Sequence, residues 1–418
     1  MPKVEVTFCT YDRPGNVGGP FSWLLQLLPA LRDRGIEGRC LCLTHYGETG
    51  PVVEGLRTAG FDCRVANCHP RTVDQVRWIL ERLAEQPPTV FVPNLVVSAY
   101  HAAKYLRPLG IPSVGVIHSD DSYYQAIIQE FVRGTSHQSL ASVVCVSDVL
   151  KEQVVSCGSQ QLIVERIPCG ARVPHELVIP QVGRFRVAYV GRLAEEQKRI
   201  SDTTRALIRA CQQIPGSEAV IFGDGPDRSN VERILESEGS GVAVRLAGNV
   251  PNSEIQQQLL QFDVITLLSD YEGLPVALLE AMACGCVPVC MQMRSGIPEL
   301  VQHDVSGLIV TDRNDSFLAA MKRLAANPDL RISLGKNARQ VVQKMYSLDH
   351  TADLWKHHLL KLGARHFPRR FVLPRRIVLA KRNPALESEQ QRIGPPSSVT
   401  EFLRRTRMWA GKVRRRLL

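Results

Sequence analysis

Short apolar runs alternate with amphipathic segments along the first half of the chain. The runs VEVTFCTY, GRCLCLTH, FDCRVAN, TVFVPN and PSVGVIH have the β-branched, apolar composition of buried strands. The segments between them, such as PFSWLLQLLPALRDRG and VDQVRWILERLAEQ, repeat apolar positions at helical spacing. Strands that alternate with helices in this way predict a parallel sheet with right-handed crossovers, in a Rossmann-like arrangement.

The same alternation starts again after the Pro-containing stretch at residues 174–184, which predicts a hinge. FRVAYVG, EAVIFGDG, VAVRLAGNV, DVITLLSD, CVPVCMQM and SGLIVTD are the strands expected in a second parallel layer. We therefore expect an α/β protein with two Rossmann-like domains that face each other across a cleft. The expected parts are residues 1–182, residues 183–345, a C-terminal helix at 346–363 that packs back toward the first domain, and a basic tail at 364–418.

The net charge of +10 is concentrated in that tail. Residues 364–418 contain fifteen Lys/Arg and three Asp/Glu, so the rest of the chain is slightly acidic. Residues 401–418 place Phe402, Trp409, Val413 and Leu417 near one helical face and arginines around it. A basic amphipathic helix of this kind suits an anionic membrane surface, with a solvated tail as the alternative. Nucleic acid is not expected as a partner, because aromatic residues are sparse and no binding module is present.

Composition otherwise indicates a globular protein, with 44% apolar and 22% charged residues. No apolar run approaches the ~20 residues of a membrane-spanning helix. The start, MPKVEVTFCTYDRPG, lacks the pattern of a signal peptide. The expected location is the cytoplasm, with peripheral attachment to the cytoplasmic membrane face through the tail. The twelve cysteines stand mostly alone in apolar runs, which predicts reduced, buried thiols; a structural zinc site is the alternative.

Candidate chemistry gathers in loops that follow strands, where ligands bind in open parallel sheets. Gly18 and Gly19 precede a helix, whose free N–H groups could face an anion, although a tight turn would use the same glycines. Arg192 and Lys198 follow the strand FRVAYVG, and two converging cations suit a diphosphate. The alternative is that both pair with Glu195 and Glu196 at the surface.

Two further loops carry glycines or acids. Gly223 lies in VIFGDGP, which lacks the third glycine of a dinucleotide fingerprint; with no P-loop present, NAD binding and P-loop phosphoryl transfer are poorly supported. In YEGLPVALLE a helix begins near Pro275, and the N–H groups of its first turn could receive a phosphate. Glu272 precedes this helix, whereas Glu280 lies inside it among apolar residues. A carboxylate there can accept two hydrogen bonds from a ribose diol.

At this point the chain resembles a known family. GRLAEEQKRISD, IFGDGP, VRLAGNV, DVITLLSDYEGLPVALLEAMACGCVPV and SGIPELVQHDVSGLIV follow one another in the order of the nucleotide-sugar-binding half of glycosyltransferase family 4. Members of this family are retaining enzymes of the GT-B architecture, and Glu272 and Glu280 match the family's E-x7-E motif. Looser likeness in GNVGG, IHSD and VVCVSDVLKE extends the resemblance over residues 3–360.

The resemblance implies a retaining transfer of sugar from a nucleotide-sugar donor to a hydroxyl acceptor, in surface polysaccharide, glycolipid or other glycoconjugate synthesis. It assigns Arg192 and Lys198 to the donor diphosphate, Glu280 to the ribose and Glu272 to the transferred sugar. It also assigns His118 to the reacting centre. The implied catalytic residues are His118, Glu272, Arg192 and Lys198. The implied donor-binding residues are Gly18, Gly19, Gly191, Arg192, Lys198, Gly223, Gly273, Leu274, Val276, Ala277 and Glu280.

Neither a metal nor a cofactor is expected, because cations and a helix N-terminus can stabilise the departing diphosphate. Ser119-Asp120-Asp121 is the alternative place for a metal. Two positions depart from the family pattern: Cys169-Gly170-Ala171-Arg172 replaces Asn-Gly-x-Asp, and Arg199 follows Lys198 where the family usually has glycine. That arginine could add a cation or point to solvent. A nucleotide-sugar epimerase of the same architecture and a non-catalytic relative remain alternative functions.

Overall fold

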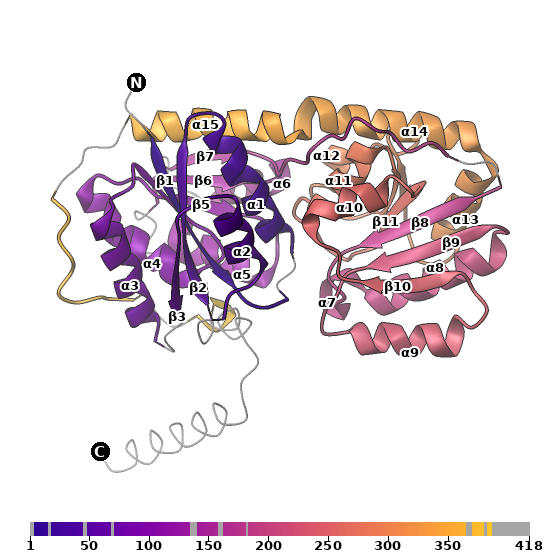
Figure 1. The fold of residues 1–418 in the computed structure, drawn as a ribbon, viewed down its shortest axis with the longest axis horizontal. Coiled ribbons are helices and arrows are strands. Elements are labelled where there is room, and N and C mark those ends of the chain that lie inside the picture. The colour runs from indigo at the N-terminus through magenta and orange to yellow at the C-terminus, as the bar shows by residue number, and fades with distance from the viewer. Residues whose placement is uncertain are drawn as a thin grey trace, which may run out of the picture.

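The structure is a computed structural model that describes residues 4–15, 18–44, 48–67, 71–133, 140–157, 162–180, 183–364, 370–379 and 383–386. Two α/β domains lie side by side, and two long C-terminal helices run along one edge of both (Figure 1). The first domain contains β1 (Glu5–Asp12), α1 (Gly19–Arg32), β2 (Glu37–Thr44), α2 (Pro51–Thr58), β3 (Cys63–Asn67), α3 (Thr72–Glu85), β4 (Val90–Pro93), α4 (Val97–Leu106), η1 (Arg107–Leu109), β5 (Val114–Ile117), α5 (Ser122–Ile127), η2 (Ile128–Arg133), β6 (Ser142–Cys145), α6 (Asp148–Cys157) and β7 (Ile163–Arg166).

The second domain repeats this alternation, and the helices that follow it return to the first domain. Its elements are β8 (Phe185–Val190), α7 (Glu195–Lys198), α8 (Ile200–Gln213), β9 (Ser217–Phe222), α9 (Arg228–Glu238), β10 (Val244–Gly248), α10 (Asn252–Leu259), β11 (Val264–Leu267), α11 (Val276–Cys284), β12 (Val287–Met291), α12 (Ile297–Leu300), β13 (Leu308–Val310) and α13 (Asp315–Ala326). The returning helices are α14 (Pro328–Val341), η4 (Val342–Tyr346) and α15 (Leu348–Gly363).

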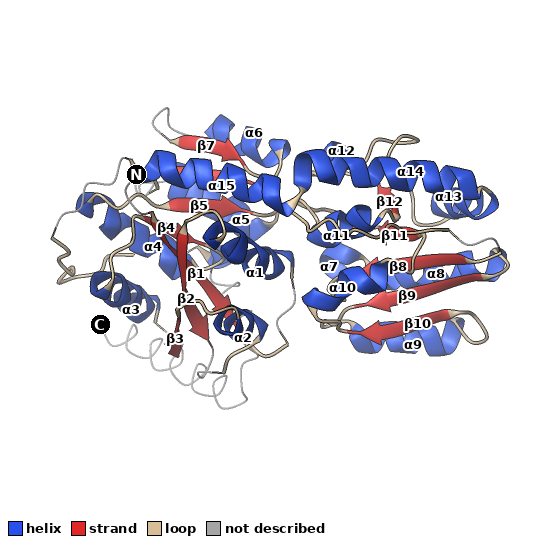
Figure 2. Cartoon of the chain, turned by 45° about the horizontal axis from the view of Figure 1, so that its top comes forward, coloured by secondary structure: helices blue, strands red, loops and turns tan. Residues whose placement is uncertain are grey.

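Both domains have the doubly wound topology that the sequence predicts. The strand orders are β3-β2-β1-β4 and β5-β6-β7 in the first domain, joined by a parallel bridge between Phe91 and Ser113. The second sheet has the order β10-β9-β8-β11-β12-β13, and its strand pairs are all parallel. Helices cover both faces of each sheet (Figure 2), which is why central strands such as β4 and β11 are apolar without alternation. The strand order reverses between β1 and β4 and between β8 and β11, the places where ligands bind in such sheets.

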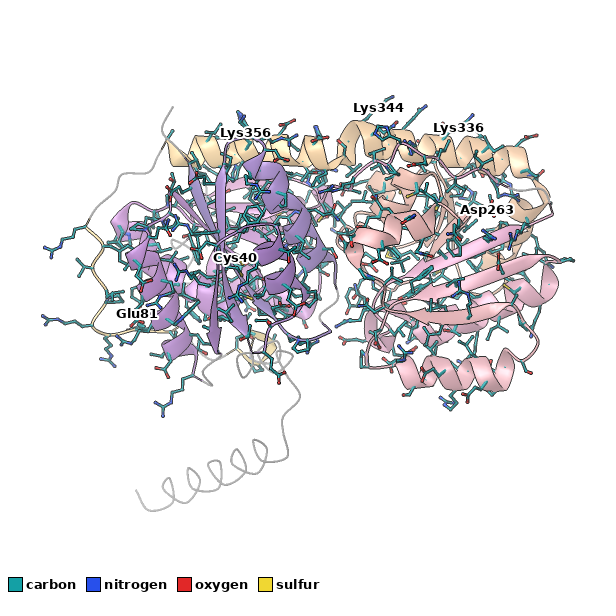
Figure 3. All side chains as sticks on the ribbon, in the orientation of Figure 1. Cys40, Glu81, Asp263, Lys336, Lys344 and Lys356 are labelled. Atoms are coloured by element: carbon teal, nitrogen blue, oxygen red, sulfur yellow. The ribbon has the colours of Figure 1, made fainter. Side chains whose placement is uncertain are left out.

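Helix α15 belongs to the first domain by packing, although it comes after the second in the chain. Trp355 on α15 is fully buried against Phe8 of β1 and Trp23 of α1, with ring centroids 6.2 and 5.7 Å apart. Arg34, in the turn after α1, adds an ion pair with Asp353, with Nε 2.6 Å from Oδ1. Lys336, Lys344 and Lys356 point away from the domains on the outer side of these helices (Figure 3). Helix α15 therefore buries its apolar side on the first domain, whereas α14 packs on the second domain.

None of the described helices is long and apolar enough to cross a membrane. The eleven described cysteines are unpaired and nine of them are buried, as the sequence predicts. Burial raises the pKa of thiols such as Cys145 to about 12, so they act as small apolar side chains. Of the basic tail, residues 370–379 and 383–386 are described, and Ile377 and Leu386 join the core of the first domain. The amphipathic helix expected at 401–418 lies outside the described residues.

Candidate active site

Lys198 and Glu272 form a buried ion pair where β8 and β11 end. Lys198 closes the short helix α7, and its Nζ lies 2.5 Å from Oε1 of Glu272 in the loop after β11. Only 13% and 7% of the two side chains are exposed. Gln197 holds the same loop by donating to the Tyr271 carbonyl, at 3.0 Å, and to Glu272 Oε2, at 3.4 Å. The fold thus joins two residues that are far apart in sequence, and the alternative pairing of Lys198 with Glu195 or Glu196 is wrong.

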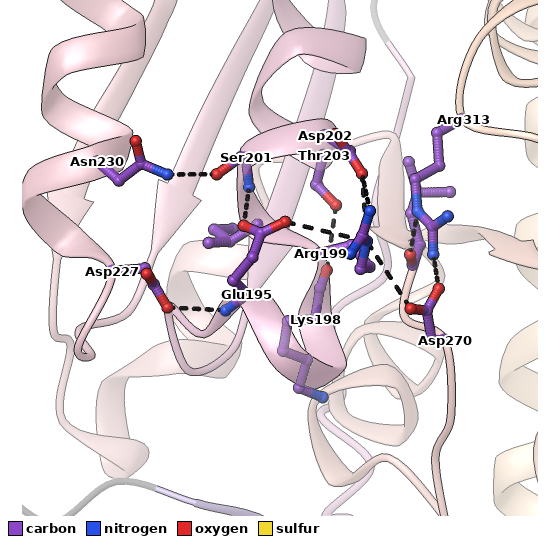
Figure 4. A network of polar contacts seen from close by, with 12 residues as sticks. Glu195, Lys198, Arg199, Ser201, Asp202, Thr203, Asp227, Asn230, Asp270 and Arg313 are labelled. Atoms are coloured by element: carbon purple, nitrogen blue, oxygen red, sulfur yellow. Dashed lines mark hydrogen bonds and ion pairs between the residues drawn. The ribbon is translucent and has the colours of Figure 1, made fainter.

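A network of charges holds the loop around α7 in place (Figure 4). Arg199 pairs with Asp202, at 2.9 Å, and approaches Asp270 to 3.7 Å. Arg313 also pairs with Asp270. Arg199 is therefore held by acids of its own domain, while 40% of its side chain stays exposed to solvent. Its φ of 48° is in the left-handed region, which explains why the family usually has glycine there.

Two helix N-termini, one from each domain, meet beside this pair. Helix α11 begins at Val276 after Pro275, so the N–H groups of Val276 and Ala277 lie in its first turn, where no helical carbonyl can bond them. Helix α1 begins at Gly19, and a Cβ at Gly19 would lie 3.3 Å from Val276 Cγ2. Each helix start carries a partial positive charge and favours an anion. Arg192, just after β8, makes no ion pair with another described residue, so its charge remains available at the same edge.

His118 follows β5 and touches the donor-side loop through its backbone. A Cβ at Gly273 would lie 1.8 Å from the His118 carbonyl oxygen, so only glycine fits there. The ring of His118 is buried beside Trp23, with centroids 4.9 Å apart, and Nε2 lies 2.8 Å from Oδ1 of Asn94. Burial lowers the pKa of His118 to about 3. The imidazole is therefore neutral at physiological pH and a weak general base.

Glu280 is buried inside α11 and is bonded from both domains. Its Oε1 accepts from Gln26 Nε2 on α1, at 3.1 Å, and from Asn252 Nδ2 at the start of α10, at 3.0 Å. Burial raises the pKa of Glu280 to about 7, although the bonds from Asn252 and Gln26 favour the charged form and reduce the shift. The expected ribose-binding carboxylate thus lies at a contact between the domains. Leu274 is also buried, and the flanking Ala277 is half-buried.

The other predicted positions are explained first by packing. A Cβ at Gly223 would lie 1.9 Å from the Gly191 carbonyl oxygen, so these glycines let the loops after β8 and β9 touch. Their donor-binding roles stay predictions, as does that of Gly18, which precedes α1 as its N-cap. Asp121 caps α5 by accepting the Tyr124 N–H at 3.0 Å, and Asp120 accepts Gln153 Nε2 at 2.8 Å. These acidic side chains thus already have protein partners.

Three site residues escaped the sequence analysis: Gln26, Asn94 and Asn252. Gln26 did leave a signal, because it is a polar residue within the apolar segment FSWLLQLL of α1. Asn94 ends the strand TVFVPN, where a side chain reaches the ligand-binding edge. Asn252 follows a proline in an ordinary helix start and left no signal. Each of the three residues forms a hydrogen bond with a predicted site residue that lies elsewhere in the chain.

A cavity of about 610 Å³ lies elsewhere, at the hinge, where Arg172, Arg339 and Asp349 are among its lining residues. None of the predicted donor-binding residues lines it. The predicted cations, acids and helix N-termini meet at the strand ends instead.

Comparison with known proteins identifies the family of the chain. Residues 179–341 match the family described as Glycosyl transferases group 1, and residues 17–173 match Glycosyltransferase Family 4. The chain is 28% identical over 278 residues to the putative colanic acid biosynthesis glycosyltransferase WcaL of Escherichia coli, covering 61% of this chain and 66% of WcaL. The alignments with the curated relatives span less than two thirds of those proteins' own lengths.

Solved structures show the same fold. TarM of S. aureus superposes with a TM-score of 0.69 at 12% identity, covering 86% of this chain and 99% of TarM. HepE of Anabaena, in complex with UDP and glucose, has a TM-score of 0.68 at 18% identity and covers 85% and 99%. The two family matches together take in most of the chain. The protein therefore belongs to the family 4 glycosyltransferases and has their GT-B architecture.

Proposed function

We propose that this protein is a retaining glycosyltransferase that moves a sugar from a nucleoside diphosphate sugar to a hydroxyl acceptor. The observation that carries the proposal is the meeting of two helix N-termini, from α1 and α11, beside Lys198 at the carboxyl edges of both sheets. Two helix starts and two cations suit a diphosphate. The acidic groups Glu272 and Glu280 flank that point and suit the hydroxyls of the sugar and the ribose.

The hard step is departure of the diphosphate, whose bridging oxygen gains charge as the anomeric C–O bond breaks. Arg192, Lys198 and the N–H groups at the start of α11 stabilise that charge, and no metal or other cofactor is called for. The acceptor oxygen bonds to the anomeric carbon on the same face, and its proton passes to the departing phosphate oxygen. The low pKa of His118 supports this route, because a ring that stays neutral is poorly suited to take the proton itself.

The names of the relatives suggest which donors and acceptors to test first. HepE is bound to UDP and glucose in its structure, so UDP-sugars are the first donors to test. WcaL is named for colanic acid biosynthesis, which supports a surface-polysaccharide or lipid-linked acceptor. The epimerase and the non-catalytic alternatives lack a supporting observation of this kind.

A transfer assay with UDP-, GDP-, ADP- and TDP-sugars tests the proposal. Product should form with the sugars of one nucleotide, and NMR should show that it keeps the anomeric configuration of the donor. Product should still form when EDTA is present. Lys198→Ala and Arg192→Ala should each lower kcat by about a hundredfold, the usual loss of one charge-stabilising group. Arg199→Ala, whose partners are Asp202 and Asp270, is the matched control and should keep most activity. Full activity in both Ala variants, or epimerised donor as the product, would refute the proposal.

We also propose that the basic tail attaches the enzyme to an anionic membrane, at its cytoplasmic face, through residues 401–418. The described part of the tail supports this, because Val372, Leu373 and Val378 are 65%, 40% and 53% exposed close to arginines at 370, 375 and 376. Exposed aliphatic side chains interleaved with arginines suit a lipid surface better than nucleic acid. Tyr105 on α4 accepts the Val378 N–H at 2.7 Å and so holds this segment on the first domain.

A further inference from the structure

Asn94 is a fully buried amide that the backbone holds at the carboxyl end of β4. The backbone N–H of Asn94 donates to the Cys9 carbonyl at 2.8 Å, which extends the pairing of β1 and β4 by one residue. The next residue, Leu95, has a φ of 64°, which is rare and unfavourable for a bulky side chain. A strained backbone beside a site is a reason to ask what the neighbouring side chain does there.

The amide oxygen of Asn94 meets the ring of His118. Oδ1 lies 2.8 Å from Nε2, and an amide oxygen can only accept a hydrogen bond. Nε2 therefore carries the hydrogen, and Nδ1 is left with a lone pair. The other amide atom, Nδ2, is buried without a partner in the described part of the chain. Because an unpaired buried donor destabilises a fold, stability alone does not account for asparagine at this position.

The groups around the His118 ring leave the choice of tautomer to Asn94. Trp23 from α1 and the phenol of Tyr124 from α5 pack against the ring, with centroids 4.9 and 6.2 Å away. The donor-domain loop touches the His118 backbone through Gly273, and its Glu272 is paired with Lys198. Burial, rather than a neighbouring charge, keeps the imidazole neutral.

We propose that Asn94 is a positioning residue that holds His118 as the neutral Nε2–H tautomer, so that Nδ1 accepts a hydrogen bond from a sugar hydroxyl in the cleft. The proposal rests on the transferase function above and extends it by one residue of the first domain. A His118 protonated on both nitrogens would present a donor at Nδ1 and lose this contact.

Nitrogen-15 NMR of the full chain tests the tautomer without any substrate. The wild type should show the Nε2–H pattern for His118. Asn94→Leu, which removes the acceptor at similar volume, should convert it to a mixture. Ser113→Ala is the matched control, because Ser113 is another buried polar side chain whose hydroxyl has no partner among the described residues. The Nδ1–H pattern in the wild type, or an unchanged tautomer in Asn94→Leu, would overturn the proposal.

Activity gives a second and independent readout. Asn94→Leu should lower kcat/KM by about tenfold, the value of one hydrogen bond, with an unchanged or higher Tm. Asn94→Asp places a carboxylate at Nε2, which favours the imidazolium and raises the pKa of His118. The activity of Asn94→Asp should then fall as the pH decreases toward 6. The wild type should show no such fall, and adding His118→Asn to Asn94→Asp should remove it. Wild-type kinetics in both Asn94 variants would overturn the proposal. If neither the wild type nor any variant transferred sugar, the transferase function would be refuted, and the NMR result on the tautomer would still stand.

Discussion

The carboxyl group of Glu280 lies in surroundings that favour its neutral form. It is buried in α11, and the two groups that bond it, Gln26 and Asn252, are uncharged amides. Burial is the larger effect and raises the pKa of Glu280 to about 7 from an ordinary 4.5. A neutral residue of the same shape would suit the fold better at pH 8. The acid is therefore explained by what it binds.

Replacing the carboxyl group of Glu280 with an amide should raise the stability of the protein and weaken its binding of the donor. Because its pKa is higher in the folded protein, the folded state binds more protons, and stability falls as pH rises from about 4.5 to about 7. The loss is at most on the order of 3 kcal/mol above that range. Glu280→Gln should remove it, so the variant should resist more urea than the wild type at pH 8 and about as much at pH 5. Its affinity for the nucleotide sugar should drop by about tenfold, measured by calorimetry.

Glu236→Gln, at an exposed position on α9, is the control and should change neither quantity. A Glu280→Gln protein that is less stable at pH 8, or that binds the donor as tightly as the wild type, would contradict this reading of Glu280.

Among the secondary-structure elements, the loop between β11 and α11 decides how closely the domains meet. Gly273 in this loop lies against the His118 backbone at the end of β5. Gly296, before α12, bonds the same loop by donating its N–H to the Gly273 carbonyl at 2.8 Å. Neither contact involves a side chain, so both depend on the absence of a Cβ. The contact of this loop with the first domain is therefore made by backbone atoms, in addition to the side-chain contact between Gln26 and Glu280.

A single methyl group at Gly273 should hold the cleft apart. In Gly273→Ala the new Cβ would lie 1.8 Å from the His118 carbonyl oxygen, whereas in Gly363→Ala, at the end of α15, it would lie 3.2 Å from side-chain methyl groups of Thr89 and Val4. Gly273→Ala should lower kcat by about a hundredfold or more, because misplaced reacting groups lose that much. Gly363→Ala should keep activity within a few-fold. Steady-state kinetics and small-angle X-ray scattering together check this, and a compact, active Gly273→Ala enzyme would contradict it.

Viewed as a whole, the molecule separates its catalytic and basic parts. The candidate site lies between the domains, whereas the excess positive charge lies in residues 364–418, whose described portion packs on the first domain. Helix α15 also returns to that domain, so both C-terminal segments converge on the side expected to bind the acceptor. This arrangement would bring a membrane-held acceptor to the cleft.

Vesicle binding should follow the tail. The full chain should sediment with vesicles of equal parts phosphatidylglycerol and phosphatidylcholine but not with phosphatidylcholine alone, and salt should weaken the binding. A chain ending at residue 400 should bind at least about a hundredfold more weakly, because it lacks seven of the basic residues. Val372→Ser with Leu373→Ser should weaken binding further, whereas Ile179→Ser, at a position 81% exposed on the hinge segment, should not. Equal binding by the full and shortened chains would refute the membrane role of residues 401–418.

Much of this architecture could be predicted because parallel strands and amphipathic helices are local patterns. The run DVITLLSD predicts β11 from its own composition, and Pro275 marks the start of α11 within one residue. Lys198 and Glu272 could also be selected locally, as polar residues in loops after strands. Their pairing could not, because an ion pair across 74 positions depends on where the fold brings the two loops.

The chain's pattern of apolar and polar positions was enough to establish two parallel sheets, their loops and most of the charged residues at the strand ends, since each depends on neighbours along the chain. The tertiary structure alone decided that Arg199 binds acids, that Gly223 serves packing, and that Gln26 and Asn94 contact Glu280 and His118. It also decided that the pKa of Glu280 is raised and that the pKa of His118 is lowered. These properties arise from desolvation and from contacts between distant segments, and both exist only once the domains have folded and closed on each other.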